Sequence, residues 1–116
     1  MYKEFIIIFT IIAIIIGLDI LCNNYIEKTV NNISEDLNIL KRDIEEKNQI
    51  QSQEKMQEIK EKWRKKYNVL AYYIEHDELE KVETKLTELS ADIDTKEYEH
   101  CINDIQVTMF ILEHMI

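Results

Sequence analysis

The sequence contains no proline and only one glycine, Gly17, so it lacks the residues on which tight turns and strand ends mostly depend. A single glycine also excludes the glycine-rich loops that hold phosphate groups. What remains is a chain that favours long helices joined by short links. Its Glu, Lys, Ile and Leu residues form the mixed charged and apolar composition that is typical of helical bundles.

Cysteine and histidine are also scarce, which argues against a metal centre or an activated thiol. Cys22 and Cys101 lie far apart in the sequence, so no intramolecular disulfide is expected, and Cys101 is interpreted as a small core residue. Glu97 and His100 have the spacing of a di-iron helix, but the second pair that this site requires is missing. We therefore expect no catalytic residue, no metal and no cofactor, and the chain is interpreted as a non-enzyme.

Acidic residues outnumber basic ones, which gives the chain a net charge of -9. The charges are unevenly distributed along the sequence. Residues 41–66 hold nine Lys/Arg and six Asp/Glu, whereas residues 67–116 hold three and twelve. Nucleic-acid binding needs a net basic face, so nucleic acid is not an expected partner. The densest basic cluster has two interpretations. It is either a solvated helix face or a contact with anionic lipid or an acidic partner. This cluster consists of Lys60, Lys62, Arg64, Lys65 and Lys66.

A long hydrophobic run occupies residues 5–18, and after Asp19 it continues to Cys22. Its 18 residues would span about 27 Å as a helix, close to the hydrocarbon thickness of a bilayer. No small-x-small cleavage site follows, so residues 1–22 are predicted to be an uncleaved transmembrane signal anchor, with the lipid bilayer as a partner. The predicted membrane-embedded side chains are Phe5, Ile6, Ile7, Ile8, Phe9, Ile11, Ile12, Ile14, Ile15, Ile16 and Leu18.

The orientation of this anchor is weakly encoded. Lys3 precedes the run, and three basic residues follow within about twenty positions, which are Lys28, Lys41 and Arg42. Very short N-termini usually stay cytoplasmic in signal anchors, and an acidic domain crosses membranes readily. We therefore expect a single-pass protein of the cell membrane whose helical domain lies outside the cytoplasm.

Beyond the anchor, apolar residues recur at alternating spacings of four and three, as in a coiled-coil seam. The six positions of this stripe are Ile26, Val30, Ile33, Leu37, Leu40 and Ile44. The stripe can lie against another segment of this chain or against a partner helix, and residues 23–53 are predicted to be a heptad-patterned stalk or packing helix. The pattern lapses between residues 45 and 55, where the helix either continues with a phase shift or turns near residues 48–53.

Residues 54–116 are predicted to form an antiparallel helical bundle with short links at 75–77 and 93–95. Asp77 with Glu80, and Asp94 with Glu97, are predicted to cap two of its helices. The last helix is apolar nearly all round at residues 109–112, so Phe110 and Ile111 join the 26–44 stripe as candidate partner-binding residues. Trp63 and Tyr67 are interpreted as core or core-edge residues.

The stretch from Trp63 to His114 resembles a family of small single-span membrane proteins of unknown function from clostridia and related spore-forming Firmicutes. The resemblance is carried by Trp63, by the junction Glu75-His76-Asp77-Glu78-Leu79 and by the closing run Phe110-Ile111-Leu112-Glu113-His114. It implies no enzyme activity and no ligand. It does imply an accessory subunit whose partner is another membrane protein, of the multi-span YetF-like kind.

The expected fold is therefore all-α, with an N-terminal transmembrane helix that continues into a heptad-patterned helix and then a small antiparallel bundle. The expected function is that of a non-catalytic, membrane-anchored interaction or accessory protein, such as a subunit of a cell-envelope or spore-membrane complex. The alternative is a structural coiled-coil membrane protein that resembles small division-complex subunits and forms homo-oligomers through residues 26–44. A small sensor or enzyme with a pocket inside the bundle is a third alternative.

Overall fold

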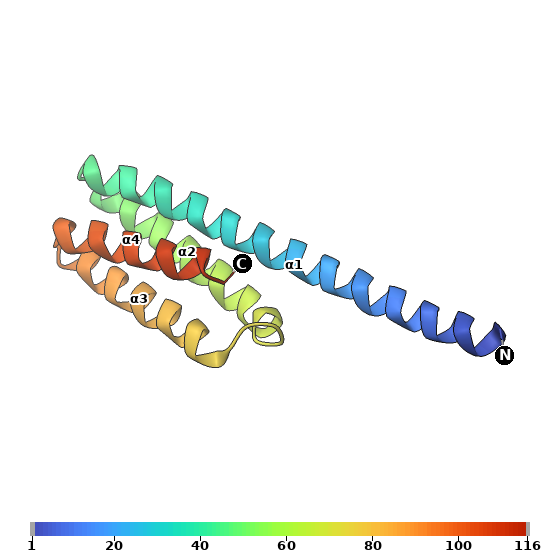
Figure 1. Cartoon of the computed structure of the whole chain (residues 1–116). Coiled ribbons are helices and arrows are strands. Elements are labelled where there is room, and N and C mark those ends of the chain that lie inside the picture. The colour runs from blue at the N-terminus through green and yellow to red at the C-terminus, as the bar shows by residue number, and fades with distance from the viewer. Residues whose placement is uncertain (1, 116) are drawn as a thin grey trace.

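The computed structural model describes residues 2–115, so Met1 of the predicted anchor and Ile116 of the predicted last helix lie outside it. The chain forms four helices, α1 (Tyr2–Glu45), α2 (Gln49–Leu70), α3 (His76–Asp94) and α4 (Tyr98–Glu113) (Figure 1). No strand occurs among the described residues. The predicted all-α fold, a long apolar N-terminal helix followed by a helical bundle, is thereby confirmed.

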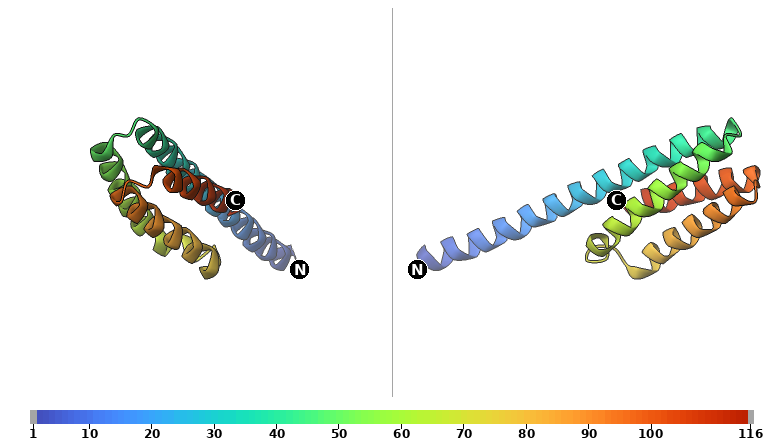
Figure 2. Two further views of the ribbon diagram at one scale, coloured as in Figure 1. Left: turned by 90° about the vertical axis from the view of Figure 1, so that its left-hand side faces the viewer. Right: turned by 180° about the vertical axis from the view of Figure 1, so that it is seen from behind.

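Helix α1 has two halves with different surroundings. Its first half projects beyond the other three helices, which gives the molecule extents of 69 × 22 × 20 Å (Figures 1 and 2). The most apolar 18-residue window of this helix is 0% buried against the rest of the chain. By length and composition, α1 is therefore the one helix among residues 2–115 that could cross a membrane or serve as a signal anchor.

The second half of α1 forms a four-helix bundle with α2, α3 and α4. Each helix packs against two neighbours, in the order α1, α2, α3, α4 and back to α1, and within the described residues no Cα atoms of the diagonal pairs lie within 8 Å of each other. Since consecutive helices are antiparallel, this is an up-down-up-down bundle. Trp63 is 3% exposed and Tyr67 packs at the edge of the core, so both are core or core-edge residues as predicted.

All six residues of the 26–44 stripe are buried inside this bundle, with exposed fractions of 7% or less. They face the other helices of the same chain, because a stripe about 100° wide fills the space between two neighbouring helices. Their assignment to an external partner is therefore corrected. The segment is a packing helix of the core and does not project as a stalk.

The chain reverses between α1 and α2 at Glu46–Asn48, where the apolar pattern lapses. Lys47 adopts a left-handed conformation with φ 55°, which ends α1. Asn48 then caps α2, because its Oδ1 accepts a hydrogen bond of 3.3 Å from the Gln51 backbone N–H. The lapse is thus a turn rather than a phase shift, and it starts before residues 48–53.

The predicted caps at Asp77 and Asp94 are wrong. Helix α3 starts two residues earlier than a cap at Asp77 would allow. Its N-cap position is Glu75, which makes no side-chain cap hydrogen bond, and Asp77 lies within its first turn. Asp94 is the last residue of α3, because Lys96 takes φ 60° and the Glu97 N–H donates to the Asp92 carbonyl at 2.9 Å. The links are therefore residues 71–75 and 95–97 instead of 75–77 and 93–95.

Candidate functional site

The residues that the sequence singles out for metal or thiol chemistry are Glu97, His100 and Cys101. Among residues 2–115, no group of three or more His, Cys, Asp or Glu side chains is placed to hold a metal ion. The His100 Nε2 lies 4.0 Å from the Glu97 carboxylate, but both side chains are exposed. Cys101 is buried, as predicted, and burial followed by nearby Asp92 and Asp104 raises its thiol pKa to about 12. Its thiol therefore stays protonated at neutral pH and is not an activated nucleophile.

The most distinctive surface lies at the end of the bundle from which the apolar half of α1 emerges. We call it the exit end, and it comprises α1 at residues 22–25, the end of α2, the 71–75 link and the end of α4 (Figure 2). Large aromatic side chains are exposed there, with Tyr72 at 85%, Tyr73 at 55% and Phe110 at 60%. A side-chain interaction with Cys22 raises the pKa of Tyr73, so the link touches α1 where the apolar segment ends.

A groove runs between α1 and α2 from the exit end toward the middle of the bundle. Its volume is about 220 Å³. Three lysines line it and no Asp or Glu does. The lining residues are Tyr25, Lys28, Thr29, Asn32, Ile33, Lys62 and Lys66. The Lys66 Nζ lies 5.0 Å from the centroid of the Tyr25 ring, within the range of a cation–π interaction.

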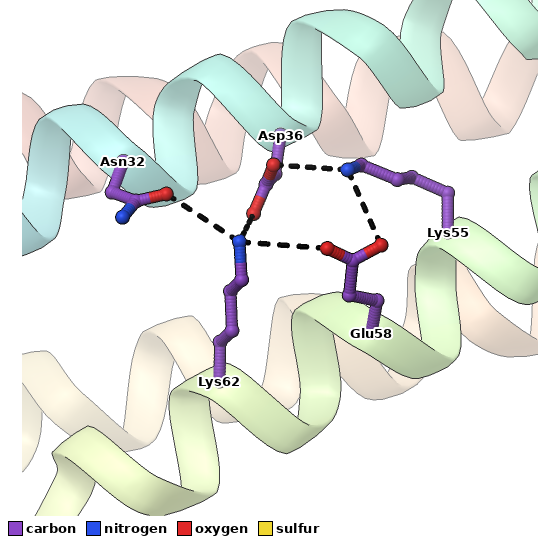
Figure 3. Close-up of polar contacts among 5 residues, drawn as sticks. All are labelled: Asn32, Asp36, Lys55, Glu58 and Lys62. Carbon is purple, nitrogen blue, oxygen red and sulfur yellow. Dashed lines mark hydrogen bonds and ion pairs between the residues drawn. The ribbon is translucent and has the colours of Figure 1, made fainter.

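The far edge of the groove is held by an ion-pair network around Asp36 (Figure 3). Asp36 is only 6% exposed, and its two carboxylate oxygens accept from Lys62 at 2.6 Å and from Lys55 at 3.0 Å. Glu58 closes the ring at 3.3 Å from Lys55 and 3.5 Å from Lys62. Since Asp36 belongs to α1 and the other three to α2, the network holds these two helices in register.

The pKa values in this network follow from its contacts. Burial by itself would raise the pKa of Asp36, but the hydrogen bonds from Lys62 and Lys55 outweigh it and lower that pKa below its ordinary value. The hydrogen bond to Asp36 raises the pKa of Lys62. Against the opposing effect of burial, the hydrogen bond to Asp36 also raises the pKa of Lys55. Asp36, Lys55 and Lys62 therefore remain charged around neutral pH. Lys62 is held in place by Asp36 and also lies 3.5 Å from the Asn32 side-chain oxygen.

A second buried carboxyl lies on the opposite side of the bundle, between α3 and α4. Asp104 is 5% exposed, and its Oδ2 has no hydrogen-bond partner within residues 2–115. Burial, followed by a hydrogen bond with Asp92, raises the pKa of Asp104 to about 6, against a smaller lowering by Lys85. No ligand chemistry follows from this pair, but the folded state holds a proton there more readily than the unfolded chain does.

The candidate residues expected from the sequence occupy different environments. The eleven predicted membrane-embedded side chains, from Phe5 to Leu18, are all exposed on bare α1. Phe110 is exposed and Ile111 is half-buried against the core, so only these two of the partner-binding candidates reach the surface. The place of Lys28 in the groove and the ion-pair network around Asp36 were not expected from the sequence. The one signal for Asp36 was its position beside Leu37, next to the apolar stripe.

The chain belongs to the family described as Domain of unknown function (DUF4363), whose model matches residues 20–116. The match covers the bundle and the last residues of the apolar segment. No curated protein and no solved structure matches the chain.

Proposed function

We propose that this chain is a non-catalytic accessory protein, held in the cell membrane by α1 and presenting the bundle to another membrane protein. The observation that carries the proposal is the continuity of α1 over 44 residues. Its first half is apolar and does not pack against the rest of the chain, and its second half is one of the four helices of a packed bundle. A soluble protein would leave a surface of this size exposed to water, whereas a bilayer covers it.

The exit end supports this arrangement. Tyrosine and other aromatic side chains favour the interface between lipid and water, because one part of each ring is apolar and the other is polar. Tyr25, Tyr72 and Tyr73 lie where α1 would leave the hydrocarbon, so they would sit at headgroup level. With these tyrosines at headgroup level, the bundle would lie directly on the membrane surface, and the apolar tip of α4 would be available for contacts close to the bilayer.

The partner that we propose is an integral membrane protein within a cell-envelope or spore-membrane complex, of the multi-span YetF-like kind that the resemblance implies. Phe110 and Ile111 are the candidate contacts, since they combine surface position with apolar character at the exit end. Self-association through residues 26–44 has less support, because that stripe is already used inside the bundle. We further propose that the bundle lies outside the cytoplasm.

Membrane anchoring and orientation are tested together by cysteine labelling in intact cells. Glu46→Cys in a Cys22→Ser background places one exposed thiol at the α1–α2 turn, while Cys101 stays buried. Labelling by a membrane-impermeant maleimide without lysis is expected. Thr10→Cys is the matched control, because lipid would shield it in either orientation. Labelling of Glu46→Cys only after lysis would reverse the orientation. Equal labelling of Thr10→Cys, or release of the protein by alkaline carbonate, would contradict the anchor.

The partner surface is tested by replacing Phe110 with a photo-crosslinking amino acid in the full chain, in its native membrane. We expect crosslinked products that contain an integral membrane protein, identified by mass spectrometry. The same group at Thr87, which is exposed on α3, should give none of these products. Products that contain only two copies of this chain would instead favour the homo-oligomeric alternative.

A further inference from the structure

We propose that the groove between α1 and α2 binds the phosphate headgroup of an anionic phospholipid from the bilayer that holds α1. This deepens the proposed function and rests on it, because the ligand comes from the membrane in which the chain is anchored. Three observations favour this ligand: the height of the groove above the apolar segment, the charge of the groove and its shape.

The height of the groove follows from the geometry of α1. An α-helix rises about 1.5 Å per residue, so Tyr25, Lys28 and Asn32 lie about 4, 9 and 15 Å beyond Cys22 along the axis. The headgroup layer on each side of a bilayer is about 5–8 Å thick. The Tyr25 backbone therefore falls within this layer, and the Lys28 backbone lies just beyond it, at a distance that its long side chain can span. Lys66 is at the same level, since its ammonium group lies 5.0 Å from the Tyr25 ring.

The charge of the groove selects an anion. Lys62 is neutralised by Asp36 and Glu58, but Lys28 and Lys66 form no ion pair within residues 2–115. The two ammonium groups thus converge on one groove from α1 and α2, without a carboxylate among the lining residues. Helix α2 as a whole is also basic, since it carries six Lys/Arg and three Asp/Glu, whereas α3 carries two Lys/Arg and seven Asp/Glu. Basic residues at a membrane surface are attracted to anionic lipid.

The shape of the groove fits a headgroup. Thr29 and Ile33, both buried, line it together with lysines from α1 and α2. Its volume of about 220 Å³ is several times the share of one water molecule, about 30 Å³, so it has room for a phosphate and part of its glycerol. The Tyr25 hydroxyl can hydrogen-bond to the phosphate or glycerol oxygens. Tyr25 and Lys66 are the lining residues nearest the exit end, so one end of the groove lies beside the apolar segment, where the acyl chains would enter the bilayer.

The proposal is tested by titrating the full chain in detergent with phosphatidylglycerol or phosphatidylcholine and counting bound lipids by native mass spectrometry. Wild type should bind phosphatidylglycerol in preference to phosphatidylcholine. Each lysine at a membrane surface contributes about fivefold to binding, so Lys28→Gln with Lys66→Gln should weaken phosphatidylglycerol binding about 25-fold. The matched control is Lys41→Gln with Arg42→Gln, which removes the same charge from α1 near the opposite end of the bundle. It should bind like wild type. Circular dichroism would confirm that both double variants fold.

Several outcomes would overturn the proposal. Equal binding of the two lipids by wild type, or equal losses in the two double variants, would leave no role for the groove. Competition by glycerol phosphate at the same concentration as the lipid would indicate a soluble phosphate ligand. Stronger competition by an acidic peptide would indicate an acidic protein partner. Release of the wild-type chain from native membranes by alkaline carbonate would instead defeat the proposed anchoring, whatever the lipid preference in detergent.

Discussion

Asp36 and Asp104 are almost equally buried, at 6% and 5% exposure, yet their pKa values move in opposite directions. Asp36 lies between α1 and α2 with two lysines within 3.0 Å, and these lower its pKa. Asp104 lies between α3 and α4, where burial, followed by the neighbouring Asp92 carboxyl, raises its pKa to about 6. The comparison shows that burial alone does not decide the charge state. The sign of the neighbouring groups decides it, and here that sign differs between the basic and the acidic side of one bundle.

The largest effect is expected when Asp36 loses its charge. Asp36→Asn would leave Lys55 and Lys62 with only the half-exposed Glu58 as a shared anion. The folded state should lose about 2–3 kcal/mol at pH 7, since breaking a buried ion pair costs about 3–5 kcal/mol and Lys62 is partly exposed. Urea unfolding in detergent, followed by Trp63 fluorescence, measures the change. An unchanged unfolding midpoint would show that the network does not hold α1 to α2.

Removing the charge of Asp104, between α3 and α4, should instead raise the stability of the folded state. Asp104→Asn removes a charge that is unfavourable in the folded state at pH 7. A pKa raised from 3.8 to about 6 corresponds to about 3 kcal/mol, and we expect a gain of about 2 kcal/mol, because the asparagine is still a buried polar side chain. The same unfolding assay applies, and Asp92→Asn is a useful companion because it removes the neighbouring negative charge instead. A loss of stability in Asp104→Asn would mean that the carboxylate has a role that the amide cannot replace.

The stability of the wild-type chain should change with pH in two opposite ways, one from Asp104 and one from Asp36. The folded-state pKa of Asp104 lies above its unfolded value, so the folded state binds more protons and gains stability as pH falls from about 7 to 4. The folded-state pKa of Asp36 lies below its ordinary value of 3.8, so its contribution is lost as pH falls below about 4. Thermal unfolding from pH 3 to pH 8 should therefore give a maximum near pH 4–5, with changes of about 1–2 kcal/mol. In Asp104→Asn the rise between pH 7 and pH 4 should shrink.

The smallest effect is expected at Glu58. Its side chain is 51% exposed, so Glu58→Gln weakens two ion pairs that water already screens. The loss should be at most about 0.5 kcal/mol, and it should disappear at high salt. A loss as large as that of Asp36→Asn would show that the four charges act as one cooperative unit.

The positions of the helices were largely predictable because their apolar residues recur every three or four positions, which places Leu37, Ile59, Leu89 and Ile105 in the core. The helix ends were less predictable. Lys47 and Lys96 close two helices in left-handed conformations, and nothing about a lysine signals that role. The polar contacts were not predictable either, because Lys62 and Asp36 are 26 residues apart and meet only when α2 folds back along α1. The same reversal brings Lys66 to Tyr25 and creates the groove.

The uninterrupted helix α1 also sets an angular register between the apolar segment and the bundle. Each residue of an α-helix turns the chain by about 100°, so one residue inserted at Asn24 would rotate every face of the bundle by about that angle and lift it by about 1.5 Å. A four-residue insertion would nearly restore the facing, at about 40°, but would lift the bundle by about 6 Å. Facing and height can therefore be varied separately in this molecule. Any contact that depends on the direction in which the bundle faces, such as one made by Phe110, would be lost with the first insertion and recovered in part with the second.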